Sequence, residues 1–216
     1  MKEIETKKIP INLMLTEGKN NMNMPAEIDA NLYDRYVDQY TVIWNKFLIE
    51  RIDEEKNKLN MSSGLVLDIG AGTARTIIEM ASLSNFKNFK FIGVDFFPDM
   101  VTKAKDNIVR FQLDHIIRIE QGDVHCMSYR DETFDIIIGR SVVHHWQDPV
   151  MAYQEMYRVL KPGGFILIHE PCKNPDPQAL SIFNKYRQDC GIHGVNLESK
   201  YTTEEIHGQL ARAGLD

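Results

Sequence analysis

Hydrophobic residues recur along this chain with two different periods, and each period predicts one kind of element. Short apolar runs that end at a polar residue predict parallel strands, because the strands of a parallel sheet are buried on both faces. Apolar residues at intervals of three and four between these runs predict amphipathic helices. The predicted strands lie at 65–69, 89–95, 116–120, 134–139 and 165–169. Strands that alternate with helices in this way predict an α/β fold, with a doubly wound, mostly parallel sheet and helices on both of its faces.

The region before the first predicted strand divides into two parts. Residues 1–28 are polar and irregular, and we expect them to form a flexible lead. Residues 29–57 have a helical pattern rich in large side chains: Leu32, Tyr33, Tyr36, Val37, Tyr40, Trp44, Phe47, Leu48 and Ile52. Such a stripe usually packs a helix on its domain, and the alternative is that the tyrosine hydroxyls face a pocket. We therefore expect an N-terminal helix that is a candidate lid, followed by one domain over 64–216.

Local signals mark where several helices begin. Pro98 and Pro149 are suited to the first helical position, and Asp148 is a good N-cap directly before Pro149. Thr202 and Glu205 have the spacing of a capping box, which predicts a last helix that ends near the chain's final glycine.

The first predicted strand leads into a glycine-rich turn. Gly70 and Gly72 follow the acid Asp68, and glycine permits positive φ and lets a ligand approach bare backbone. The amides of such a turn favour an anionic group, such as a carboxylate or a phosphate. The dinucleotide-binding pattern requires a third glycine where this chain has Arg75, so the turn departs from that of NAD-dependent oxidoreductases.

Polar residues stand at or just beyond the end of each predicted strand: Asp68, Asp95, Asp123, Arg140 and Glu170. Because ligands of parallel sheets bind outside the carboxyl ends of the strands, these residues predict one ligand site. Asp95 follows Gly72 by 23 residues, which is the spacing at which an acid meets ribose hydroxyls in nucleotide-binding folds. Phe96 comes next and is placed to cover an adenine face.

Composition limits the classes of function. The chain has 216 residues, 43% of them hydrophobic and 26% charged, which is typical of a globular domain. Its net charge of −6 argues against a nucleic-acid partner. Cys126, Cys172 and Cys190 lack metal-ligand spacing, so we expect no metal. No apolar run approaches the ~18 residues of a membrane span, and no signal peptide is recognisable, so we expect a cytoplasmic protein.

Residues 65–170 resemble the class I S-adenosylmethionine-dependent methyltransferases, in the branch that includes ubiquinone and menaquinone biosynthesis enzymes. The resemblance rests on several motifs in order: the Asp68–Gly72 turn, Asp95, Gly122-Asp123, Asp131-Glu132-Thr133-Phe134-Asp135, Val143-His144-His145-Trp146 and Arg158-Val159-Leu160-Lys161-Pro162-Gly163-Gly164. It implies a Rossmann-like sheet with the strand order 3-2-1-4-5.

The resemblance also implies S-adenosylmethionine as cofactor and a role for each cofactor-binding residue. Gly70 and Gly72 hold the methionine carboxylate end, which Asp68 supports. Asp95 binds both ribose hydroxyls. The adenine contacts are implied for Phe96, Asp123 and Val124, and the backbone around Arg140 receives the ammonium group.

The methyl acceptor is expected to be a small organic molecule with an O, N or C nucleophile, because the sequence pattern of DNA adenine methylation is absent after Gly139. A general base is needed only if the nucleophile starts protonated. His144 and His145 are the catalytic candidates, and Tyr33, Tyr36, His169 and Glu170 are further ones; for each, a structural role in its loop is an equal alternative. A catalytically silent S-adenosylmethionine-binding module remains an alternative, and an NAD-dependent oxidoreductase is a more distant one.

In the resembling family the sheet usually has seven strands, and the last two are missing here. The strand at 165–169 would then be an apolar edge, of the kind that proteins normally protect. We expect the sequence to be a fragment of a longer protein. The alternatives are that a partner subunit, as in a homodimer, or the chain's own N-terminal lead covers this edge.

Overall fold

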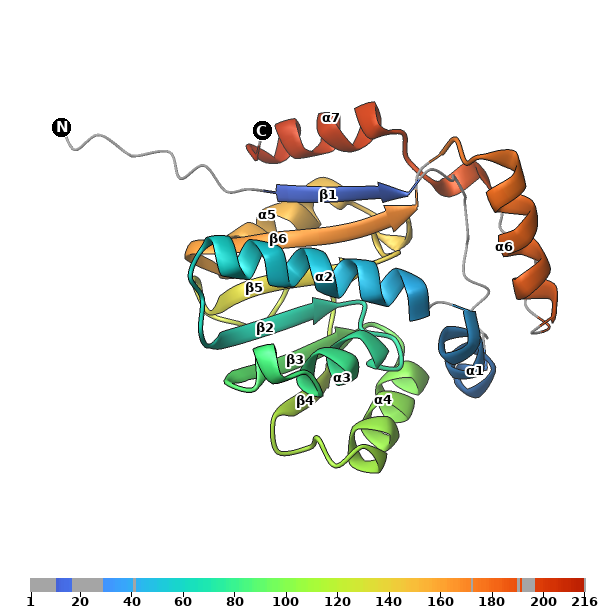
Figure 1. The fold of residues 1–216 in the computed structure, drawn as a ribbon. Coiled ribbons are helices and arrows are strands. Elements are labelled where there is room, and N and C mark those ends of the chain that lie inside the picture. Colours follow the sequence, from blue (N-terminus) through green and yellow to red (C-terminus); the bar gives the residue numbers. More distant parts are fainter. Residues whose placement is uncertain are drawn as a thin grey trace.

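The computed structural model describes residues 11–16, 29–40, 42–171, 173–189, 191 and 197–215. In these residues six parallel strands form one sheet in the order β1-β6-β5-β2-β3-β4 (Figure 1). The strands are β1 (Ile11–Thr16), β2 (Gly64–Ile69), β3 (Phe89–Asp95), β4 (Ile117–Gln121), β5 (Phe134–Arg140) and β6 (Leu160–Pro171). The predicted fold class is confirmed, because the five expected strands have the order 3-2-1-4-5 in β4-β3-β2-β5-β6.

The central strands are apolar because both of their faces are covered. β2 pairs with β5 in a register that places Val66 beside Ile136 and Leu67 beside Ile137. All four side chains have no exposed surface. Alternate residues of these strands enter two separate cores, which explains why the runs are continuously apolar rather than alternating.

The described helices and 3₁₀ turns lie between strands or after β6. They are α1 (Ala30–Tyr40), α2 (Val42–Lys58), α3 (Arg75–Ala81), η1 (Ser84–Phe86), α4 (Pro98–Arg110), η2 (Val143–His145), α5 (Pro149–Val159), α6 (Pro177–Asp189), η3 (Leu197–Ser199) and α7 (Thr203–Ala213). Two predicted N-caps are confirmed: Asp148 accepts a hydrogen bond from the backbone N–H of Met151 at 3.1 Å, and Thr202 and Glu205 form a capping box.

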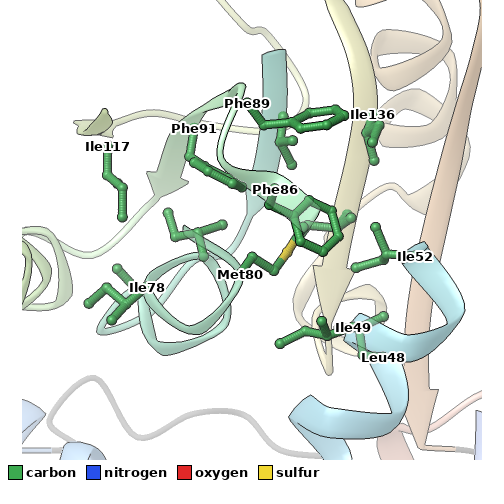
Figure 2. Packing of buried hydrophobic residues seen from close by; sticks show 14 of the residues in the cluster. Leu48, Ile49, Ile52, Ile78, Met80, Phe86, Phe89, Phe91, Ile117 and Ile136 are labelled. Atoms are coloured by element: carbon green, nitrogen blue, oxygen red, sulfur yellow. The ribbon is translucent and has the colours of Figure 1, made fainter. Parts of the chain in front are cut away.

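One core lies between the sheet and the helices α2, α3 and α4. Figure 2 shows Ile49 and Ile52 of α2 facing Met80 of α3 and Phe86 of η1. The second core lies on the opposite face of the sheet, where α5 and α7 supply Met156, Ile206 and other buried side chains. The described helices all lack the length and apolar character that crossing a membrane requires.

The N-terminal region differs from the prediction in two ways. Residues 1–28 were expected to be a flexible lead, but Ile11–Thr16 forms β1; the rest of this lead lies outside the described residues. The helix expected over 29–57 is two helices, α1 and α2, which point in different directions in Figure 1.

β1 covers the edge that the sequence predicted to be apolar and unprotected. It runs parallel to β6, in a register that pairs Ile11 with Ile166 and Thr16 with Pro171. Three explanations were considered for this edge. In the structure, part of the chain's own N-terminal lead lies beside it. Local sequence does not reveal this pairing, because it joins residues 155 positions apart, as in Ile11 and Ile166 (166 − 11).

Candidate functional site

The glycine turn after β2 has the backbone geometry that the sequence predicted. Gly70 and Gly72 have φ angles of 65° and 54°, in the left-handed region that glycine tolerates best. A Cβ atom on Gly70 would lie 2.5 Å from Cγ1 of Val142, so this turn and the loop after β5 are in direct contact. A side chain at Gly70 would therefore be strained by its backbone and would clash with Val142.

Asp95 at the end of β3 joins this turn. Its Oδ2 accepts a hydrogen bond from the Gly72 N–H at 2.8 Å, and its Oδ1 accepts one from the Phe97 N–H at 3.0 Å. Burial raises the pKa of Asp95, and the backbone N–H groups oppose this shift. Each carboxylate oxygen has a second lone pair for a ligand hydroxyl. Phe96, the next residue, is 62% exposed and presents an apolar ring beside this acid.

Asp68 lies deeper, at the end of β2, and is only 3% exposed. Burial raises its pKa to about 7, the charge of Arg140 opposes the shift, and the nearby charge of Asp95 adds to it. The structure therefore brings Asp95 and Arg140 within electrostatic reach of Asp68, as expected for strand ends of one sheet edge.

Asp123 after β4 is joined to His125. The backbone N–H of His125 donates to Oδ1 of Asp123 at 2.9 Å, and the His125 Nδ1 atom lies 2.5 Å from the same oxygen. The backbone N–H of Asp148 donates to Nε2 of His125 at 3.2 Å, which assigns the ring proton to Nδ1. Burial raises the pKa of Asp123, but these contacts with His125 lower it more, so its net shift is downward. No local sequence signal predicts this link, which connects the end of β4 with the start of α5.

Glu170 at the end of β6 organises the loop after β5. It has no exposed surface, and its Oε2 accepts the backbone N–H groups of Val142 and Val143 at 2.8 and 3.1 Å. Its Oε1 contacts Nδ1 of His144. Burial raises the pKa of Glu170, but His144, Lys200 and the backbone donors together lower it. Burial is also the main cause of the lowered pKa of His144, so the pair consists of a carboxylate and a neutral imidazole that donates from Nδ1.

The other histidine candidates have different surroundings. The ring of His145 lies against that of His144, with centroids 3.9 Å apart. His169 precedes Glu170, is 4% exposed and stacks on Trp44 of α2 at a centroid distance of 6.0 Å. Burial, followed by the charge of Arg140, lowers the pKa of His169 to about 4, so its imidazole is neutral near pH 7.

The tyrosines of α1 lie near the carboxyl ends of the strands, where Figure 1 shows α1 and α6 beyond the arrowheads. Cε1 of Tyr33 comes within 3.4 Å of where a Cβ on Gly72 would lie, so Tyr33 covers the glycine turn. Tyr36 is 4% exposed and has the guanidinium of Arg187 over its ring, 5.6 Å from the centroid. Burial raises the pKa of Tyr36 to about 12, so its hydroxyl keeps its proton.

A buried amide holds α1 in this place. Nδ2 of Asn107, on α4, donates to Oδ1 of Asp34 and to the carbonyl of Thr73, both at 3.0 Å. Asn107 is 1% exposed and Asp34 5% exposed. One side chain thus connects α1, α4 and the end of the glycine turn. This contact was missed from the sequence, since an asparagine on a predicted helix has no local mark that distinguishes it.

A comparison with known families identifies a match over most of the chain. The family model described as a methyltransferase domain matches residues 61–214. This range contains the glycine turn and all five polar strand ends.

Several proteins that are similar to this chain are named as methyltransferases. A phosphoethanolamine N-methyltransferase 1 of Triticum aestivum is 26% identical over 168 residues, covering 70% of this chain and 33% of its own length. A ubiquinone/menaquinone biosynthesis C-methyltransferase of Geotalea daltonii is 28% identical, covering 59% of this chain and 51% of its own. This chain therefore spans about a third of the length of the wheat relative. A solved structure of a putative S-adenosylmethionine-dependent methyltransferase of Methanococcus maripaludis has a TM-score of 0.59 and 28% identity, covering 75% of this chain and 67% of that one.

Proposed function

This chain belongs to the family of S-adenosylmethionine-dependent methyltransferase domains, and we propose that it transfers a methyl group from S-adenosylmethionine to a small organic acceptor. The observation that carries the proposal is the contact between Glu170 and His144, at the same edge of the sheet as the glycine turn and Asp95. It supports the assignment of a base at the edge of the sheet whose residues suit the cofactor.

The side chains and backbone at the strand ends fit this cofactor. Gly70 and Gly72 leave a turn with bare backbone, and Asp95 has acceptor capacity for two hydroxyl groups. The exposed ring of Phe96 offers an apolar surface for adenine. We assign Asp123 and Val124 to the adenine edge, Asp68 to the support of the methionine end, and the backbone at Arg140 to its ammonium group.

S-adenosylmethionine supplies an electrophilic methyl group, and the protein must align the acceptor and remove its proton. Alignment alone accounts for much of the catalysis of such displacements. His144 is our candidate for the proton acceptor. Since Glu170 receives its Nδ1–H, Nε2 retains a lone pair, and in the described part of the chain no hydrogen bond engages that atom. Burial lowers the pKa of His144 and so keeps the imidazole neutral and able to accept a proton near pH 7.

We further propose that α1 is a lid over the acceptor. Tyr33 covers the glycine turn, and Asp34 is fastened to α4 through Asn107. A lid excludes water from the reacting groups and completes the site. The names of the relatives specify different acceptor atoms, nitrogen in one and carbon in another. The acceptor proposed here is therefore defined by its nucleophile, which carries a proton before methylation.

The test combines the purified protein with S-adenosylmethionine and fractions of a metabolite extract, and measures S-adenosylhomocysteine. We expect product with at least one fraction, and loss of product in His144→Gln with cofactor binding retained. Tyr157→Phe, a change at an exposed position on α5, is the matched control. Cofactor binding without product in any fraction would favour a silent binding module. Calorimetry that detects binding of NAD, but no binding of S-adenosylmethionine, would contradict the proposal altogether.

A further inference from the structure

A buried lysine lies close to Glu170, the partner of the candidate base. Lys200 lies between η3 and α7, and its side chain is 6% exposed. Its Nζ lies 3.9 Å from Oε1 of Glu170. A buried ammonium is costly unless an opposite charge faces it. Burial lowers the pKa of Lys200 to about 7, and the charge of Glu170 opposes this shift. Glu170 is therefore the partner that favours the charged form of Lys200.

The two oxygens of Glu170 have different tasks. Oε2 receives the backbone N–H groups of Val142 and Val143, which fixes the loop after β5. Oε1 faces both Nδ1 of His144 and Nζ of Lys200. Lys200 thus acts on the same oxygen that holds the imidazole.

We infer that Lys200 is a positioning residue for methyl transfer: its ammonium keeps Glu170 a carboxylate, and this carboxylate holds His144 as the tautomer with its proton on Nδ1. The inference rests on the proposed function, in which Nε2 of His144 takes the acceptor's proton. The proton passes from the acceptor to Nε2, and Lys200 neither gains nor loses one in that step.

The groups around the pair determine the direction of the effect. Burial lowers the pKa of His144, Glu170 opposes this shift, and the charges of Lys200 and Arg187 add to it. The ring of His145 also lies against His144. Electrostatic interactions connect Glu170 with His169 on β6, Tyr153 on α5 and Tyr201 in the segment before α7. Glu170 favours the protonated form of His144, and the charge of Lys200 opposes this effect. Loss of that charge therefore raises the pKa of His144, so the base is protonated at a higher pH.

The experiment measures kcat/KM for an active acceptor against pH in the full chain. Lys200→Met keeps an unbranched side chain of similar length and removes its charge, and Lys200→Arg keeps the charge. We expect Lys200→Met to move the acidic limb upward by about one pH unit, which is about a tenfold loss of kcat/KM on that limb. In Lys200→Arg the acidic limb should stay at its wild-type pH, and the Kd for S-adenosylmethionine should stay unchanged in both variants. An acidic limb that stays in place in folded Lys200→Met, with a uniform loss at every pH, would overturn the inference.

A second measurement needs no variant that must fold. Nitrogen chemical shifts of His144 in the wild-type protein at pH 7 should identify the Nδ1–H tautomer. The Nε2–H tautomer would overturn the inference. The outcome for His144→Gln separates the two proposals. Full activity of that variant contradicts the assignment of the base, whereas an inactive His144→Gln with an unmoved limb in Lys200→Met contradicts the role of Lys200 alone.

Discussion

Replacing Asn107 with leucine should release α1 from the rest of the domain. Leucine has a similar size but removes both hydrogen bonds that Nδ2 donates, to Asp34 and to the Thr73 carbonyl. The Thr73 carbonyl and the buried Asp34 carboxylate would then each lose a donor. Lys103 remains near Asp34, with Nζ 3.7 Å from Oδ2, and compensates only part of that loss.

The magnitude follows from the burial of these groups. A buried polar group that loses its partner costs about 1–3 kcal/mol, so two such groups cost about 3 kcal/mol after the remaining contact of Lys103 is counted. If this cost falls on the docking of α1, the equilibrium constant for docking decreases by about a hundredfold. We therefore expect faster hydrogen exchange throughout α1 and faster release of S-adenosylmethionine.

The assays are denaturant unfolding, hydrogen exchange of α1, and stopped-flow release of the cofactor. Asn57→Leu is the matched control, because Asn57 is an exposed asparagine on α2 and its hydrogen bond to Asp53 is also exposed. Lys56, which donates to Oδ1 of Asn57, keeps its ion pair with Asp53 at 3.1 Å in this variant. It should change stability by less than about 0.5 kcal/mol. If Asn107→Leu behaves like this control in both stability and α1 exchange, the reasoning about the buried amide is refuted.

Three other outcomes are expected. Asp95→Ala should weaken S-adenosylmethionine binding by about 2–3 kcal/mol, the scale of lost charge-assisted hydrogen bonds; an unchanged Kd by calorimetry in a folded variant would reject this role. Deleting residues 1–16 removes β1 and exposes the edge of β6, so light scattering should detect association; a stable monomer would show that the edge needs no cover. The raised pKa of Asp68, about 7, means that the folded protein retains a proton that the unfolded chain loses at lower pH, so wild-type stability falls as pH rises from about 4 to 7. Asp68→Asn should therefore have a higher Tm than wild type at pH 8 and little advantage at pH 4, and an equal difference at both values would contradict the shift.

The strands, the glycine turn and several helix starts can be predicted from the amino-acid sequence. Each depends on neighbouring residues: β2 on a continuous apolar run, the turn on Gly70 and Gly72, and the start of α7 on Thr202 and Glu205. The meeting of Asp68 with Asp95 was also predictable, because parallel strands end at the same edge of a sheet.

Groups that lie far apart in the chain come into contact only in the folded protein. β1 pairs with β6, Asn107 with Asp34, and Lys200 with Glu170. No local sequence pattern predicts these contacts, because each one stabilises the protein only after the backbone has brought its two partners together. The same holds for the protonation of His144, which depends on burial and on charges from β6 and from the segment before α7. Local pattern determines which elements form, whereas packing determines the environment in which a side chain such as His144 titrates.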